Sequence, residues 1–180
     1  MFKSLKSKLR YLYAIKVKKL TPNEYSIEQM RKGGVTIGER CRVYTYIQSH
    51  EPSMIRIGND VTVSSGVAFV THDNSILKVL DPMTDVVGPI TIGDNCFVGQ
   101  NSILMLGITL GENCIVGAGS VVTHSFPPHS VIAGNPARKI CTTEQMAEKY
   151  RGYAIDFGVI PWGQRDKYLA EHREKLVIRN

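Results

Sequence analysis

The stretch that decides the fold runs from Ile92 to Phe126 and reads IGDNCFVGQNSILMLGITLGENCIVGAGSVVTHSF. Every sixth residue in it is aliphatic, and the residue four places after each of these is small or apolar. The first set is Ile92, Val98, Leu104, Leu110, Val116 and Val122, and the second is Cys96, Ser102, Ile108, Cys114, Ser120 and Phe126. A constant six-residue period is typical of a parallel β-helix, in which each hexapeptide forms one side of a coil. A strand meander would instead alternate with a period of two.

Residue types that tolerate a sharp bend occur at regular places in the repeat. Glycine follows four of the aliphatic positions, and asparagine lies at Asn95, Asn101 and Asn113. Both types accept the backbone geometry of a corner. Since one coil cannot bury its own apolar side chains, stacking of coils supplies the core.

The same period runs less regularly upstream, from Ile37 to Phe69. It is interrupted near Ser49–Pro52 and again between Phe69 and Ile92. We therefore predict an all-β solenoid over residues 31–140 with an inserted loop over residues 75–89, where Asp81-Pro82 and Gly88-Pro89 break regular structure. A long loop in a solenoid is usually functional.

Helical segments are expected at both ends. Residues 1–30 form a basic segment in which Phe2, Leu5, Leu9, Leu12 and Tyr13 recur at helical spacing among lysines. This stripe could cap the open end of the coil or lie on an anionic membrane surface, and the two roles are compatible. Residues 141–180 predict a helical tail, with a capping box at Thr142 and Gln145, a helix over 144–150 and another over 165–177.

Length and composition indicate one domain that can bury its own core without disulfide bonds. The chain has 180 residues, of which 43% are hydrophobic and 21% charged, and its formal net charge is +6. No apolar run approaches the ~20 residues of a membrane span, and no signal peptide is indicated. Cys41, Cys96 and Cys114 fall on inward positions and show no metal or redox spacing. The expected location is a reducing cytoplasm, and the basic N-terminal segment could place the protein at the inner membrane face.

Two stretches carry a family resemblance. PITIGDNCFVGQNSILMLGITLGENCIVGAGSVVTHSFPPHSVIAGNPARKI (89–140) and IRIGNDVTVSSGVAFVTHDNS (55–75) resemble the hexapeptide-repeat acetyltransferases, specifically the sugar, capsular-polysaccharide and xenobiotic O-acetyltransferase branch. The resemblance implies a left-handed β-helix, a homotrimer with active sites between subunits, and acetyl-CoA as acyl donor without a metal.

The resemblance also implies roles in catalysis. His72, in the Thr71-His72-Asp73 context before the loop, matches the family's general base, which must take the proton of an attacking hydroxyl. The backbone amide of Gln100 matches the oxyanion donor, although the family usually has a smaller residue there. Direct transfer is expected because no exposed, activated cysteine is indicated.

Further family positions predict the coenzyme A and acceptor sites. Gly117, Ala118 and Thr123 match pantetheine contacts, while Arg138 and then Lys139 match cations for the phosphates. Candidate acceptor contacts are Tyr44, Glu51, Asp73 and Phe97; Asp73 could also orient the His72 ring.

The predicted function is O-acetylation of a sugar or surface-polysaccharide precursor. N-acetylation of an amino sugar is the nearest alternative. A carbonic-anhydrase-like zinc site would need three histidines, for which His72, His124 and His129 are the candidates. A non-catalytic scaffold is a further alternative, which the intact Gly117-Ala118-Gly119 and Asn135-Pro136-Ala137-Arg138 stretches disfavour. Nucleic acid is not an expected partner, because the basic N-terminus has no reader motif with a stacking platform.

Overall fold

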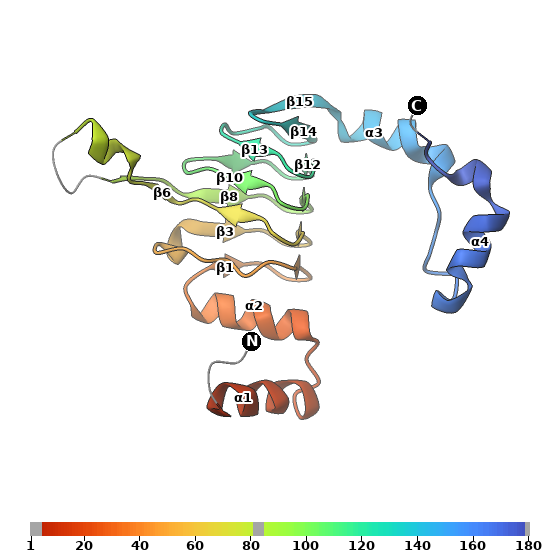
Figure 1. Cartoon of the computed structure of the whole chain (residues 1–180), viewed down its shortest axis with the longest axis horizontal. Coiled ribbons are helices and arrows are strands. Elements are labelled where there is room, and N and C mark those ends of the chain that lie inside the picture. Colours follow the sequence, from red (N-terminus) through yellow and green to blue (C-terminus); the bar gives the residue numbers. More distant parts are fainter. Residues whose placement is uncertain (1–4, 81–84, 179–180) are drawn as a thin grey trace. The chain divides into compact units, whose positions relative to one another are not determined.

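The computed structural model of the chain describes residues 5–80 and 85–178. The chain forms two compact units, Met1–Thr142 and Thr143–Asn180. The first unit has two helices followed by a stack of short strands, and the described part of the second is helical (Figure 1).

Apart from the two-stranded pair of β6 (His72–Asp73) and β7 (Val86–Val87), the strands in the described part of the first unit form three sheets. Sheet A contains β1 (Thr36–Ile37), β3 (Ile55–Ile57), β8 (Ile90–Ile92) and β11 (Thr109–Leu110). Sheet B contains β2 (Arg42–Val43), β4 (Thr62–Val63), β9 (Phe97–Val98), β12 (Ile115–Val116), β14 (Ser130–Gly134) and β15 (Ala137–Thr142). Sheet C contains β5 (Ala68–Phe69), β10 (Ile103–Leu104) and β13 (Val121–Val122).

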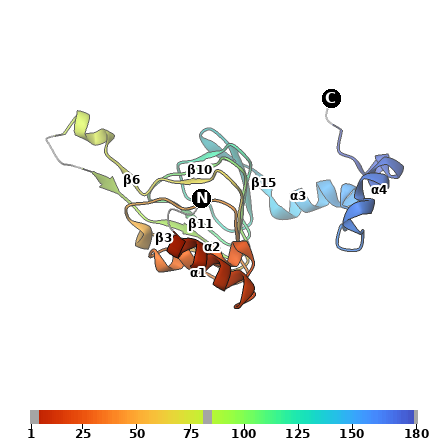
Figure 2. The same ribbon diagram turned by 60° about the horizontal axis from the view of Figure 1, so that its bottom comes forward.

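From β3 to β13, leaving aside β6 and β7, successive strands join sheets A, B and C in rotation, so the chain winds around a common core (Figure 2). Pairs within these three sheets are parallel, apart from β14 with β15, which are antiparallel. In the regular part, Ile115 pairs with Phe97 one full turn earlier. The predicted parallel coil of hexapeptides is thus present.

The six-residue period is a burial pattern. All six aliphatic positions from Ile92 to Val122 are at most 1% exposed, and the second positions from Cys96 to Ser120 are at most 2% exposed. The buried hydroxyls are paired, because Ser102 Oγ and Ser120 Oγ both donate to the carbonyl oxygen of Gly117, at 3.1 and 2.6 Å. Serine can therefore occupy the inside of the coil without an unsatisfied polar group.

Glycine and asparagine have different roles at the corners. Asn95, Asn101 and Asn113 have positive φ, between 54° and 58°, which asparagine tolerates better than most residues. The glycines after the aliphatic positions provide space instead: a Cβ on Gly99 would lie 2.5 Å from the backbone nitrogen of Ala118 in the next coil. These glycines were expected to allow a bend. That reason is wrong, because they are needed where neighbouring coils approach closely.

The helix that packs against the coil is α2 (Pro22–Lys32), not the preceding helix that carries the leucines. The Thr21 side chain and Glu24 form a capping box, with Pro22 in the first turn. Ile27 and Met30 of α2 are 5% and 3% exposed and belong to the coil's core. The preceding helix α1 (Leu5–Lys16) packs on α2, where Tyr11 meets Tyr25 edge-to-face. Phe2 lies outside the described residues.

Two excursions interrupt the coil. The first contains the short helix η1 (Pro52–Met54). The second leaves after β5 and is built from β6 (His72–Asp73), η2 (Ser75–Lys78) and β7 (Val86–Val87), with β6 and β7 antiparallel. Asp81 and Pro82, which predicted a break here, lie outside the described residues.

The second unit contains five short helices in its described part: α3 (Thr143–Tyr150), η3 (Arg151–Tyr153), η4 (Trp162–Gln164), α4 (Arg165–Glu171) and η5 (Arg173–Lys175). The predicted helix over 165–177 is too long, because His172 leaves helical geometry with φ −122° and ψ 52°. Among the described residues, no helix combines the length and apolar character needed to cross a bilayer.

Candidate active site

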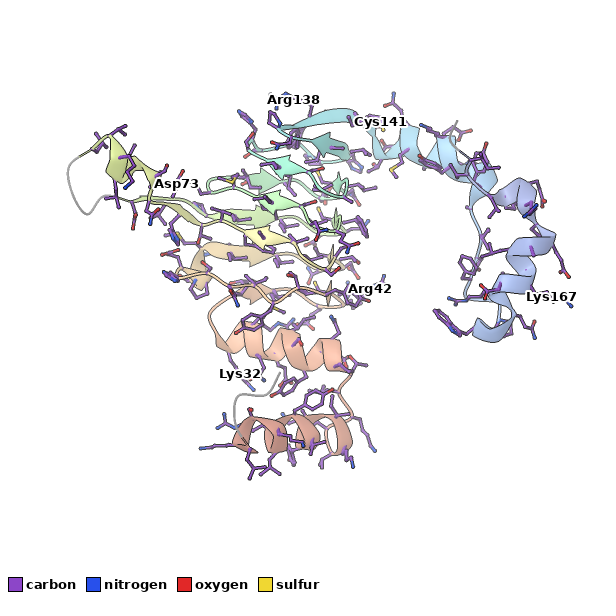
Figure 3. All side chains as sticks on the ribbon, in the orientation of Figure 1. Lys32, Arg42, Asp73, Arg138, Cys141 and Lys167 are labelled. Carbon is purple, nitrogen blue, oxygen red and sulfur yellow. The ribbon has the colours of Figure 1, made fainter. Side chains whose placement is uncertain are left out.

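His72 lies where the second excursion leaves the coil. The preceding Thr71 is 2% exposed, and its carbonyl oxygen accepts a 2.9 Å hydrogen bond from the backbone N–H of Gly88. His72 itself pairs with Val87 in the β6–β7 ladder. The outgoing and returning chains are therefore tied together at this point, which fixes the backbone that carries the imidazole. In Figure 3 the neighbouring Asp73 marks the base of the excursion.

The imidazole of His72 is held by a carboxylate from the previous coil. Nδ1 of His72 lies 3.1 Å from Oε2 of Glu51, and both side chains are about one-third exposed, at 32% and 29%. The same Oε2 accepts a 2.8 Å hydrogen bond from Oγ1 of Thr71. Glu51, a candidate acceptor contact, thus has its carboxylate against the candidate base.

Two hydroxyls extend this network in one direction. The backbone N–H of Glu51 donates to Oγ of Ser49 at 3.0 Å. Ser49 Oγ lies 2.7 Å from Thr71 Oγ1, and the Thr71 hydroxyl donates its own proton to Glu51. Ser49 is therefore the donor to Thr71, since each hydroxyl has only one proton. Glu51 is thus held from its backbone and from its side chain.

These contacts set the tautomer of His72. An ionised carboxylate only accepts hydrogen bonds, so the nitrogen facing Glu51 carries the proton of the neutral ring. Nε2 then keeps its lone pair and can accept a proton from a substrate. This is the arrangement that a general base requires.

The carboxylate is ionised at neutral pH. Its hydrogen bond from Thr71, with a smaller contribution from His72, lowers the pKa of Glu51 below the ordinary glutamate value. Asp73 has another role, because its Oδ1 accepts a 2.8 Å hydrogen bond from the backbone N–H of Ser75, which lowers the pKa of Asp73. Glu51, not Asp73, is therefore the acid that orients the His72 ring in this structure.

A hollow of about 270 Å³ opens beside the imidazole. It is lined by Gln48, Ser49, His50, Phe69, Val70, Thr71 and His72. The His50 ring stacks on that of His72, with centroids 5.4 Å apart and an interplanar angle of 27°. A second imidazole in the same hollow was not anticipated from the sequence.

Gln100, the other predicted catalytic residue, lies at a different corner of the coil from His72. After sheet B, the backbone N–H of Gly119 donates to the carbonyl oxygen of Gln100 at 2.8 Å. At the corner that follows sheet C, Val70 N–H donates to Leu104 O and Met105 N–H to Val122 O. We call each such stack of corner residues a column, and His72 comes just after the column that follows sheet C. One side of about five extended residues, roughly 16 Å, separates the columns. Within one chain, His72 and Gln100 therefore cannot contact the same acyl group.

Most candidate coenzyme A residues share the corner of Gln100. Gly117 N–H donates to Ile132 O at 2.8 Å, and Ala133 next to it pairs with Arg138 across β14 and β15. Lys139 pairs with Ile132 in the same ladder. Ala118 and Arg138 are exposed, and Figure 3 shows Arg138 at the end of the coil opposite α1 and α2. An edge with exposed backbone and two cations is thus formed here.

Two other predicted residues lie at the two corners, and a third lies on a strand. Thr123 follows β13 in the His72 column, and its Oγ1 lies 2.8 Å from Nδ1 of His124. Tyr44 follows β2 and its N–H donates to Val63 O, which places it in the Gln100 column. Phe97, on β9, is 43% exposed. Within one chain, Tyr44, a candidate acceptor contact, therefore lies at a different corner from His72.

The cysteines on the inward positions of the repeat belong to the core. Cys41, Cys96 and Cys114 are buried, as the repeat predicted. Burial is the main cause that raises the pKa of the Cys41 thiol. Among the described residues of one chain, no three histidine, cysteine, aspartate or glutamate side chains are grouped as metal ligands would be.

Sequence comparison agrees with the repeat. A family profile described as "Hexapeptide repeat of succinyl-transferase" matches residues 89–124. The protein CapG of Staphylococcus aureus is 46% identical over 136 residues, which cover 73% of this chain and 79% of CapG. The chain belongs to the hexapeptide-repeat acetyltransferase family.

Another relative and two solved structures extend this family assignment. A putative lipopolysaccharide biosynthesis O-acetyl transferase, WbbJ of Escherichia coli K12, is 28% identical, with 63% of each chain covered. A maltose O-acetyltransferase from Clostridium difficile 630 is 27% identical with a TM-score of 0.57, covering 75% of this hexapeptide-repeat chain and 82% of that one. A galactoside acetyltransferase in complex with coenzyme A has a TM-score of 0.54 at 24% identity, covering 82% and 86% of the two chains; it shares the fold.

Proposed function

We propose that this protein transfers an acetyl group from acetyl-CoA to a hydroxyl of a sugar or surface-polysaccharide precursor, with His72 as general base. The observation that carries the proposal is the contact between His72 Nδ1 and Glu51 Oε2, which leaves Nε2 free to accept a proton beside an open hollow. Family membership supplies the reaction class, and acetyl-CoA is the acyl donor of the acetyltransferases it resembles.

The proposed reaction is direct transfer. As the acceptor oxygen attacks the thioester carbonyl carbon, its proton passes to Nε2 of His72. Glu51 then faces an imidazolium, whose charge it stabilises. The carbon–sulfur bond breaks, and the thiolate of coenzyme A takes the proton from Nε2. The imidazole returns to its starting state, so no acyl-enzyme forms.

The complete site requires two copies of the chain. The backbone N–H of Gln100 is the proposed oxyanion donor, and it lies at a corner that His72 of the same chain cannot share. A neighbouring copy that brings its Gln100, Ala118 and Arg138 against His72 would complete the site. The need for a second copy supports an oligomer, and the resemblance implies a homotrimer of left-handed coils with three active sites between subunits.

The acceptor class is inferred from relatives and chemistry. WbbJ is described as a putative O-acetyl transferase of lipopolysaccharide biosynthesis, and the Clostridium difficile relative as a maltose O-acetyltransferase. Both descriptions concern saccharide hydroxyls. His50, Gln48 and Ser49 line the hollow beside His72 and offer polar atoms to such an acceptor.

The test is an acceptor screen with acetyl-CoA. Coenzyme A thiol release is followed with nucleotide sugars, oligosaccharides, lipid-linked glycans and amino sugars, and each product is treated with mild base. An O-acetyl ester is cleaved by base, whereas an amide survives. A base-stable product would support N-acetylation instead, and absence of both acetyl-CoA binding and acceptor-dependent thiol release would contradict the proposal.

A further inference from the structure

Helix α1 presents an apolar stripe that nothing in the described chain covers. Its exposed large side chains are Leu5 (74%), Leu9 (57%), Leu12 (38%) and Tyr13 (56%), and Val17 just beyond the helix is 62% exposed. The adjacent helix α2, by contrast, buries Ile27 and Met30 in the core of the coil. Closing the coil therefore does not use the stripe on α1.

Helical geometry places this stripe on the outward side. At 3.6 residues per turn, Leu5, Leu9 and Leu12 share one face, and Ala14 lies on the opposite face. Ala14 is 5% exposed, and Tyr11 packs edge-to-face on Tyr25 of α2. The stripe thus faces away from α2, and Figure 1 shows α1 beyond α2 at the end of the first unit.

Charge identifies the partner. Residues 5–20 contain six lysines and arginines and no acid, and the first acidic residue of the chain is Glu24. On the helical wheel, exposed Lys6 and Lys8 flank the leucines on either side, and exposed Lys16 lies along the same face. Arg10 and Lys18 differ, because they line a hollow shared with Glu28 of α2. A second copy of α1 would bring like charges together at the stripe.

We propose that the outward face of α1 binds the surface of an anionic phospholipid bilayer. The leucines would enter the boundary between headgroups and acyl chains, while the flanking lysines contact lipid phosphates. The helix would then lie in the plane of the surface and hold the coil beside it. This inference concerns location and does not depend on the acyl-transfer proposal.

The experiment is vesicle co-sedimentation of the full chain. Phosphatidylcholine vesicles are compared with vesicles containing about 30% phosphatidylglycerol, at low and at high salt. We expect binding to the anionic vesicles only, weakened by salt. Leu9→Glu and the double variant Lys6→Glu with Lys8→Glu should each lower the partition coefficient by about tenfold or more.

A matched control adds the same charge at a similarly exposed apolar side chain. Val159 is 78% exposed in the second unit, and Val159→Glu should bind vesicles as the unsubstituted protein does. Urea denaturation should show that all variants retain the fold. Failure of the unsubstituted protein to bind anionic vesicles, or full binding by Leu9→Glu, would overturn the inference. So would a Leu9→Glu effect on oligomer mass in solution, which would indicate that α1 contacts a second copy.

Discussion

Oε2 of Glu51 lies 3.1 Å from Nδ1 of His72, although the two residues are 21 positions apart in the chain. The contact joins two successive coils at one corner. It is reinforced by Thr71, which donates to the same oxygen at 2.8 Å. The carboxylate therefore orients the ring and faces the positive charge that the ring acquires when it takes a proton.

The first prediction concerns Glu51→Gln. Because the pKa of Glu51 is lowered, its negative charge is present at neutral pH and is lost only as the pH falls through that lowered pKa. Removing the charge makes the imidazolium less stable, so the acid limb of the kcat/KM profile should move to lower pH and kcat should fall roughly 10–1,000-fold. Glu112→Gln, a change of an exposed glutamate after β11, should leave both unchanged. An unshifted pH profile would assign Glu51 a purely structural role.

The second prediction concerns His72→Ala. Loss of the general base should reduce turnover by roughly 100- to 10,000-fold while coenzyme A affinity stays nearly unchanged. Turnover is measured by thiol release and affinity by calorimetry. His172→Ala changes a histidine of the second unit that pairs with Tyr168 and serves as control. Normal turnover in His72→Ala would remove the imidazole from the reaction.

The third prediction concerns Arg138→Ala. If the exposed guanidinium binds a phosphate of coenzyme A, the apparent KM for acetyl-CoA should rise about 10- to 100-fold. Arg56→Ala, an exposed arginine on β3, is the matched control. Acetyl-pantetheine lacks the nucleotide phosphates, so its KM should be the same for the variant and the unsubstituted protein. An effect confined to the acceptor would contradict the phosphate assignment.

The repeat made the coil predictable because its period is also its burial pattern. Each side chain from Ile92 to Val122 at the aliphatic positions points inward, so a one-dimensional rule suffices. The helix that caps the coil was harder to predict, because the leucines at helical spacing lie in α1, whereas α2 is the helix that packs on the coil. Thr21-Pro22-Asn23-Glu24 was the available signal: it is a capping box that begins a separate helix, α2, whose Ile27 and Met30 then face the coil.

The site was only partly predictable because excursions change the length of a coil. Phe97 and Ile115 are 18 residues apart, whereas Thr62 and Phe97 are 35 apart across the inserted loop. Glu51 lies in an excursion, so its place beside His72 does not follow from a fixed period. The same geometry shows that Gln100 and His72 occupy different columns, a relationship that motif matching to residue positions does not reveal.

The last prediction tests the reason for glycine at the corners. A Cβ at Gly99 would lie 2.5 Å from the nitrogen of Ala118 and 2.7 Å from the oxygen of Val116, both backbone atoms that cannot turn aside. Gly99→Ala should therefore lower the free energy of unfolding by about 1–3 kcal/mol or more, measured by urea denaturation. Gly163→Ala, where a Cβ would meet nothing within 4 Å, should change it little. Since Gly99 precedes Gln100, a separated coil would also displace the proposed oxyanion donor, so the surviving folded protein should lose turnover. Equal stability of the two variants would show that the coils can separate at this corner without cost.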